Sequence, residues 1–109
     1  MNIGYVRVSV KDELADRNVK KQMEMLSKYD IEKWYVEIGH LEVKERPVLQ
    51  RMLEELRSGD QIYVNDLARL HRDLDELYRI FKAAEEKGVH IMCMDKKLGQ
   101  EYFPFWLRK

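Results

Sequence analysis

Hydrophobic and polar positions follow two different periods along this chain, one typical of β-strands and one typical of α-helices. Runs rich in β-branched and aromatic residues predict strands at residues 2–9, 32–38, 61–64 and 89–94. Between them, apolar residues recur at steps of three and four, which predicts helices over residues 19–30, 47–57 and 73–87. This alternation predicts the α/β class, with a doubly wound, mostly parallel β-sheet and helices on both faces, in three layers.

The ends of these elements carry their own signals. Pro47 suits the first turn of a helix, where no backbone N–H is needed, and Asp73 with Glu76 matches a capping box. Residues 10–18 are polar and lack a period, so a loop is expected there. Residues 89–94 are apolar at nearly every position, which predicts a strand covered on both faces. The helix that follows Asp73 is expected to bury a stripe made of Leu74, Leu77, Tyr78, Phe81 and Ala84.

The first strand carries candidate chemistry. Side chains alternate along a strand, so Tyr5, Arg7 and Ser9 share one face. Arg7 and Ser9 are then neighbours, roughly 7 Å apart. A hydroxyl beside a guanidinium suits attack on a phosphate, because arginine offers a fixed fork of donors and stays charged. The plainer interpretation is a strand end with an exposed serine and a solvated arginine.

Further arginines are expected at the same place. In parallel sheets, sites lie beyond the carboxyl ends of the strands. That rule brings Ser9, the loop before Arg46 and the segment 65–72 to one edge, and with them Arg69 and Arg72. Guanidiniums gathered around one hydroxyl repel each other unless an anion lies among them. The pattern therefore predicts a site for an anion such as a phosphate.

Composition narrows the class of protein. The 109 residues are 45% hydrophobic and 37% charged, as in one soluble globular domain. There is no apolar run of the roughly 20 residues that span a bilayer and no signal-peptide pattern, so a cytoplasmic location is expected. Twenty Lys and Arg balance twenty Asp and Glu, so this chain alone is expected to bind DNA only weakly.

Cysteine and histidine do not indicate a metal site or a disulfide. Cys93 is the only cysteine and lies in an apolar run, which favours a reduced residue in the core. His40, His71 and His90 fall in different predicted elements, without the spacing of metal ligands. Neither a metal nor another cofactor is expected.

Three motifs together resemble a known family. Gly4-Tyr5-Val6-Arg7-Val8-Ser9, Glu45-Arg46-Pro47-Val48-Leu49 and Leu67-Ala68-Arg69-Leu70-His71-Arg72 look like the catalytic domain of serine recombinases, the resolvase/invertase family, over residues 2–95. The resemblance implies site-specific DNA recombination, in which Ser9 attacks a DNA phosphodiester and forms a covalent phosphoserine link. It implies that Arg7, Arg46, Arg69 and Arg72 stabilise the phosphate charge, and that an acidic residue acts at the position of Glu37.

The sequence departs from the family pattern at several positions. The family usually has an aspartate immediately before the first arginine of the third motif, where this chain has Ala68, with Asp66 two residues earlier. His71 replaces a glycine, His40-Leu41 stands where Ser-Gly is common, and Glu13 stands where an early glutamine is expected. By the same resemblance, residues 1–95 are expected to form the catalytic domain. Residues 96–109 form an aromatic tail, where the family continues into a dimer helix and a DNA-binding domain.

Two functions from different classes stay open on this evidence. The first is an enzyme of DNA strand exchange, which acts in resolution, inversion or integration as a homodimer or tetramer when complete. The second is a degenerate resolvase-like module that regulates by binding protein or DNA. A phosphoacceptor signalling domain is disfavoured, because it needs acidic residues at strand ends where this chain has Ser9.

Overall fold

The computed structural model describes residues 1–8, 13–39, 46–66, 69–70 and 73–94. Its strands are β1 (Asn2–Val8), β2 (Lys33–Ile38), β3 (Gln61–Val64) and β4 (His90–Cys93). They form one sheet in the order β2-β1-β3-β4, and each neighbouring pair is parallel. The helices are α1 (Glu13–Leu26), the short 3₁₀ helix η1 (Ser27–Tyr29), α2 (Pro47–Glu55) and α3 (Leu74–Lys87). The predicted α/β fold is confirmed.

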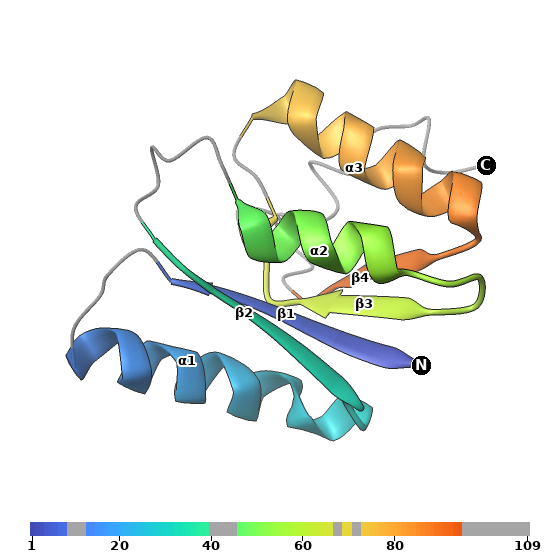
Figure 1. The fold of residues 1–109 in the computed structure, drawn as a ribbon. Coiled ribbons are helices and arrows are strands. Elements are labelled where there is room, and N and C mark those ends of the chain that lie inside the picture. Colours follow the sequence, from blue (N-terminus) through green and yellow to red (C-terminus); the bar gives the residue numbers. More distant parts are fainter. Residues whose placement is uncertain (9–12, 40–45, 67–68, 71–72, 95–109) are drawn as a thin grey trace.

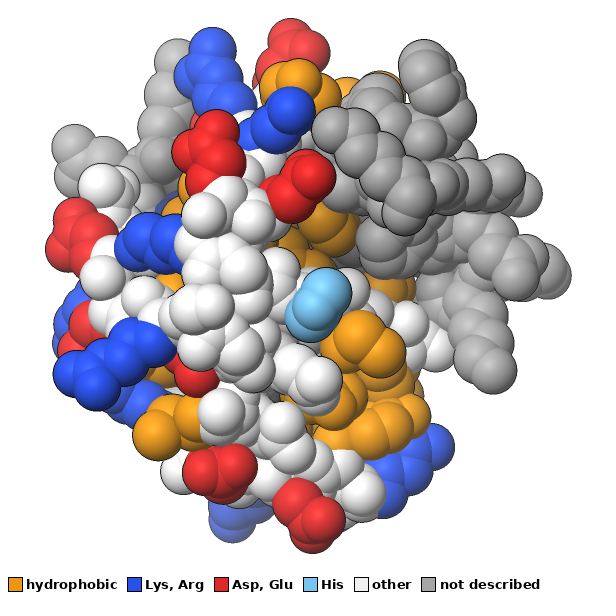
Figure 2. All heavy atoms as spheres, turned by 90° about the vertical axis from the view of Figure 1, so that its right-hand side faces the viewer, with side chains coloured by type: hydrophobic (Ala, Val, Ile, Leu, Met, Phe, Trp, Pro, Cys, Tyr) orange, Lys and Arg blue, Asp and Glu red, His pale blue; other side chains and the backbone are white. Residues whose placement is uncertain are grey.

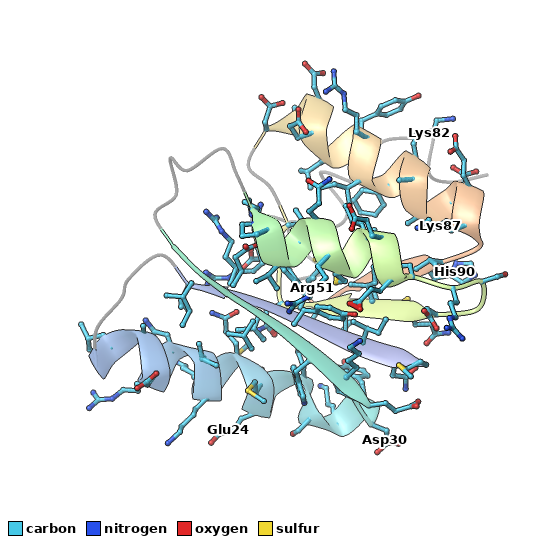
Figure 3. All side chains as sticks on the ribbon, viewed as in Figure 1. Glu24, Asp30, Arg51, Lys82, Lys87 and His90 are labelled. Carbon is cyan, nitrogen blue, oxygen red and sulfur yellow. The ribbon has the colours of Figure 1, made fainter. Side chains whose placement is uncertain are left out.

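The sheet separates two hydrophobic layers. In Figure 1, α1 lies on one face of the sheet, while α2 and α3 lie on the other. Tyr5 of β1 belongs to the larger cluster beneath α2 and α3, and its neighbour Val6 packs with Leu26 of α1. Side chains fill the space between α2 and the sheet (Figure 3). The alternation predicted along the first strand is therefore present.

Helix α1 begins earlier than the hydrophobic pattern predicts. Residues 13–18 were expected in a loop, but they are helical. The expectation was wrong because the buried face of α1 begins at Ala15, a small residue that a search for large apolar side chains does not count. The helical stretch ends at Asp30 as predicted, where the backbone is left-handed (φ 54°), but α1 itself ends at Leu26 and the last turn is η1.

Helix α3 is capped as predicted but turned differently. The Asp73 carboxylate accepts hydrogen bonds from the backbone N–H groups of Asp75 and Glu76, and Gly88 ends the helix with φ 75°. Leu74 and Tyr78, however, are exposed, and Ile80 is buried in their place. The Tyr78 ring lies instead near the Lys82 ammonium, on the solvent side of the helix.

Strand β4 is covered on one face only within the described part of the chain. Ile91 is buried, whereas Met92 on the opposite face is exposed. Figure 2 shows hydrophobic side chains exposed on the side of the molecule that lies to the right in Figure 1. The prediction of a strand covered on both faces was wrong because β4 lies at the edge of the sheet, while α1 packs against β1.

Gly4 of β1 allows close contact between the sheet and Trp34. A Cβ atom added at Gly4 would lie 2.5 Å from Cε3 of the Trp34 ring and closer still to Cζ3. We expect Gly4→Ala to lower the free energy of unfolding by about 1–3 kcal/mol, because overpacking forces the ring or the strand to shift. Urea unfolding measures this loss. Gly39→Ala is the control, since a Cβ there meets no atom within 4 Å, and equal losses in the two variants would contradict the steric explanation.

Candidate active site

The strand register brings charged side chains together at the carboxyl edge of the sheet. Arg7 near the end of β1 pairs in register with Glu37 near the end of β2. Both are 5% exposed, which is rare for charged residues unless they are paired. Helix α2 begins beside β2 (Figure 1), and residue 69 after β3 contacts both Arg46 and Arg7 at this edge. The labelled Asp30 in Figure 3 precedes β2 and so marks the opposite edge.

Glu37 connects the start of α2 to the sheet through hydrogen bonds. Its Oε1 accepts hydrogen bonds from the Tyr5 hydroxyl (2.7 Å) and from the Leu49 backbone N–H (3.1 Å). Its Oε2 accepts from the Val48 N–H (3.0 Å). Carboxylates are stabilised at helix N-termini by free N–H groups and by the helix dipole. This contact places Arg46, the residue before α2, over the sheet edge.

Arg46 uses its guanidinium to hold the segment after β3. Its Nε lies 3.6 Å from Oε1 of Glu37, and the side chain is only 7% exposed. Its Nη2 donates to the Tyr5 hydroxyl (2.6 Å) and to the backbone carbonyl of Arg69. Its Nη1 donates to the backbone carbonyl of Leu70. Arg46 therefore joins β1, β2 and residues 69–70.

Arg69 lies across the end of β1. Its Nη1 donates to the backbone carbonyl of Arg7 (3.1 Å). Its own backbone N–H donates to Oδ1 of Asp66 (3.2 Å), and its Nε lies 3.5 Å from Oδ2 of the same carboxylate. The side chain is 39% exposed. Among the arginines of the described site, Arg69 is thus the one that solvent reaches most readily.

Two buried amides that sequence reasoning missed support this edge from the α1 side. Gln22 donates from Nε2 to the carbonyl of Arg7 (3.0 Å), and Asn65 donates from Nδ2 to the backbone carbonyl of Gln22 (3.4 Å). Gln22 follows Val19 by three positions and precedes Leu26 by four. A polar residue within an apolar stripe was therefore the signal available for it. Asn65 had only its place directly after a strand.

The structure brings together four of the six predicted site residues. Arg7, Arg46 and Arg69 meet at the carboxyl edge, as expected from the strand order, and Glu37, which the resemblance implied, lies with them. Ser9 and Arg72 lie outside the described residues, as do Ala68 and His71. Val8, the last residue of β1, ends at this edge immediately before Ser9. Within the described residues, no group of three or more His, Cys, Asp or Glu side chains is placed to hold a metal ion.

Residues 2–103 match the family model described as the resolvase N-terminal domain. This chain belongs to the resolvase family. Similar curated proteins include the transposon Tn21 resolvase of Escherichia coli, which is 33% identical over 97 residues, covering 89% of this chain and 48% of that protein. A probable DNA-invertase, y4cG of Sinorhizobium fredii, is 35% identical over 92 residues, covering 84% of this chain and 29% of that protein.

This resolvase-family chain spans about half the length, or less, of the curated relatives it matches. Solved structures share its fold at low identity. A serine recombinase from Sulfolobus solfataricus superposes with a TM-score of 0.73 at 17% identity, covering 93% of this chain and 72% of that one. The C-terminal catalytic domain of ISC1926 TnpA, an IS607-like serine recombinase, gives a TM-score of 0.72 at 20% identity, covering 92% and 75%.

The structure also bears on the predictions made for Cys93 and for membrane-spanning segments. Cys93, the single cysteine of the chain, is half-buried rather than fully in the core. Its Sγ lies 4.0 Å from the backbone carbonyl of Asn65. Across the described residues, the helices are too short and too polar to cross a membrane.

Tyr5 makes alkaline stability a probe of this network. Burial, reinforced by the hydrogen bond to Glu37, raises the pKa of the Tyr5 hydroxyl well above its ordinary value, against the opposing charge of Arg46. Because the folded-state pKa is raised, the stabilisation is complete below the unfolded pKa of about 10 and is lost as pH rises through the folded value.

We expect unfolding free energy to fall above about pH 10 in the parent and less steeply in Tyr5→Phe. Urea unfolding at a series of pH values measures both slopes. Tyr78→Phe is the control, because that side chain is exposed and loss of its hydroxyl should leave the slope unchanged. Equal slopes for the parent and Tyr5→Phe would show that ionisation of Tyr5 does not cause the alkaline loss of stability.

Proposed function

We propose that this domain performs DNA cleavage and strand transfer in site-specific recombination, with Ser9 as the nucleophile. The observation that carries the proposal is the meeting of Arg7, Glu37, Arg46 and Arg69, of which only Arg69 is partly exposed. It lies at the sheet edge where β1 leads into Ser9. Such concentrated positive charge is suited to a phosphate whose charge grows in the transition state. Membership of the resolvase family supports the same function.

In the proposed reaction, the Ser9 Oγ attacks the phosphorus of a DNA phosphodiester. The Oγ–P bond forms, and the bond from phosphorus to the 3′ oxygen breaks. The serine proton passes to that oxygen, which leaves as a 3′ hydroxyl. A 3′ hydroxyl of a partner strand then attacks the phosphoserine, reverses these bond changes and restores the serine. Serine is a weak nucleophile at its ordinary pKa, so the reaction depends on the surrounding cations.

The contacts suggest different tasks for the arginines. The nitrogens of Arg46 face protein groups, and the side chain is almost fully buried. We therefore assign it to positioning residues 69–70. Arg69 keeps more than a third of its side chain exposed, so it is the described arginine best placed to meet a phosphate oxygen. Glu37 is assigned to positioning, because both its oxygens accept hydrogen bonds from the protein.

The proposed partners are double-stranded DNA and further copies of the protein, in a homodimer or tetramer. The 109-residue chain has zero formal net charge. It is therefore expected to bind DNA only in the range of non-specific contacts, about 10⁻⁴ to 10⁻⁶ M. Relatives named as transposon resolvases and as a probable DNA-invertase support resolution or inversion as the biological outcome.

The experiment that tests this function traps the covalent intermediate. The complete protein, expressed from its full reading frame, is incubated with its recombination site carrying a nick that prevents religation. We expect a protein–DNA band that survives denaturant and disappears after protease treatment. A complete protein that binds its site and yet forms no such band would contradict the enzymatic function.

A further inference from the structure

Asp66 makes three contacts with one residue of the candidate active site. It follows β3 by two positions, and its Oδ1 accepts from the Arg69 backbone N–H at 3.2 Å. Its Oδ2 lies 3.5 Å from the Arg69 Nε, an ion-pair distance. Its backbone carbonyl also accepts from the Arg69 N–H at 3.2 Å. Both the backbone and the guanidinium of Arg69 are thus tied to Asp66.

One nitrogen of the Arg69 guanidinium is hydrogen-bonded, and a second lies at ion-pair distance from a carboxylate. The Asp66 carboxylate lies beside Nε, and the Arg7 carbonyl accepts from Nη1 at 3.1 Å. A planar group held at two points has a defined orientation over the end of β1. The exposed part of the side chain remains available to an anion. The negative charge of Asp66 also offsets repulsion between Arg69 and the neighbouring Arg46.

We propose that Asp66 is the positioning residue that orients Arg69 for contact with the DNA phosphate. The proposal rests on the proposed function and adds a residue to it. The resemblance implies a carboxylate directly before Arg69, where this chain has Ala68. Here the carboxylate comes from three residues before Arg69 and contacts both its backbone N–H and its Nε.

The chain contains a matched pair that separates this role from an ordinary surface ion pair. Glu76 and Arg79 have the same spacing of three residues, and their charged groups lie 3.3 Å apart. Both lie on the exposed side of α3 and are more exposed than Asp66 and Arg69. Neither has a described contact with β1 or β2. Glu76→Gln therefore removes the same charge at the same spacing, away from the carboxyl edge.

The first test observes the guanidinium directly, in the 109-residue chain without DNA. The Nε–H resonance of Arg69 is assigned in a ¹⁵N NMR spectrum by its loss in Arg69→Lys. We expect Asp66→Asn to shift this resonance and to speed its exchange with water, while Glu76→Gln changes only the resonance of Arg79. An Arg69 resonance that is unaltered by Asp66→Asn would overturn the proposal.

The second test measures formation of the covalent adduct by the complete protein. We expect Asp66→Asn to slow adduct formation by about 10- to 100-fold, as when partners that orient metal-binding side chains are removed. In an Arg69→Lys background, Asp66→Asn should cause no further loss, because its effect passes through the guanidinium. Glu76→Gln should leave the rate unchanged.

The possible outcomes separate the two proposals. An equal loss from Asp66→Asn in the parent and in Arg69→Lys would show that Asp66 supports the fold rather than Arg69. An active parent with an unaffected Asp66→Asn variant would likewise overturn the role of Asp66 and leave the enzyme in place. A parent that forms no adduct at all would overturn the proposed function, and the role of Asp66 with it.

Discussion

Replacing Ser9 by alanine is expected to abolish the covalent protein–DNA adduct while the domain stays folded. The reason is chemical: in the proposed reaction, the Oγ of this residue forms the bond to phosphorus, and alanine has no atom that can replace it. The change removes one oxygen from a residue that follows β1, so the hydrophobic layers on both faces of the sheet are unaffected. Denaturing gels of trapped reactions measure the loss, and thermal unfolding confirms that the variant is folded.

The other two serines of the chain supply controls for this experiment. Ser27 lies in η1, just before β2, and Ser58 lies in the turn just before β3. Both are therefore near the amino edge of the sheet, opposite the candidate site. We expect Ser27→Ala and Ser58→Ala to form as much adduct as the parent. Adduct formation by Ser9→Ala at the parent level would refute the assignment of the nucleophile.

Glu37→Ala is expected to cost about 3–5 kcal/mol of unfolding free energy, the range for breaking a buried ion pair. The substitution leaves the Arg46 guanidinium buried without its carboxylate, and it removes the acceptor of the Tyr5 hydroxyl and of two N–H groups at the start of α2. A domain of this size has about 5–15 kcal/mol of stability in total, so a large share is at stake. Urea unfolding at neutral pH measures the change.

Glu55→Ala is the matched control for Glu37→Ala. Glu55 also accepts from a tyrosine hydroxyl, that of Tyr35, and lies near Lys33 and Arg51. Its side chain is 45% exposed, and exposed ion pairs contribute little to stability. We therefore expect a much smaller loss. Similar losses in the two variants would show that Glu37 does not have the structural role inferred from its contacts.

Much of the fold followed from sequence because the period of apolar residues reports burial directly. Strand β3 was predicted with its observed bounds, and Pro47 and Asp73 marked the starts of α2 and α3. The errors occurred where burial and hydrophobicity differ. Ala15 is small but buried, so a stripe traced from larger apolar residues began only at Val19. Leu74 is apolar but exposed, in the first turn of α3.

The position of the site was predictable, but its internal contacts were not. Parallel strands have one carboxyl edge, so Arg7, Arg46 and Arg69 were expected to meet there, whereas Glu37 was implied only by the family resemblance. The sequence could not show that Arg46 donates to the backbone carbonyls of residues 69 and 70, because every residue has such a group. Nor could residue types alone show that Asp66 pairs with Arg69, because an acidic and a basic residue three positions apart pair only in some backbone conformations.

The backbone carbonyl of Arg7 accepts hydrogen bonds from Gln22 on one side of the sheet and from Arg69 on the other. Substitution at residue 7 changes the side chain and leaves this acceptor in place, because every amino acid carries a carbonyl. Substitutions can therefore remove these two hydrogen bonds only by changing a donor, Gln22 or Arg69. A deep mutational scan tests the two donor side chains but cannot test the carbonyl that accepts from them. Chemical synthesis can test this acceptor, because an ester in place of the peptide bond after Arg7 weakens the carbonyl.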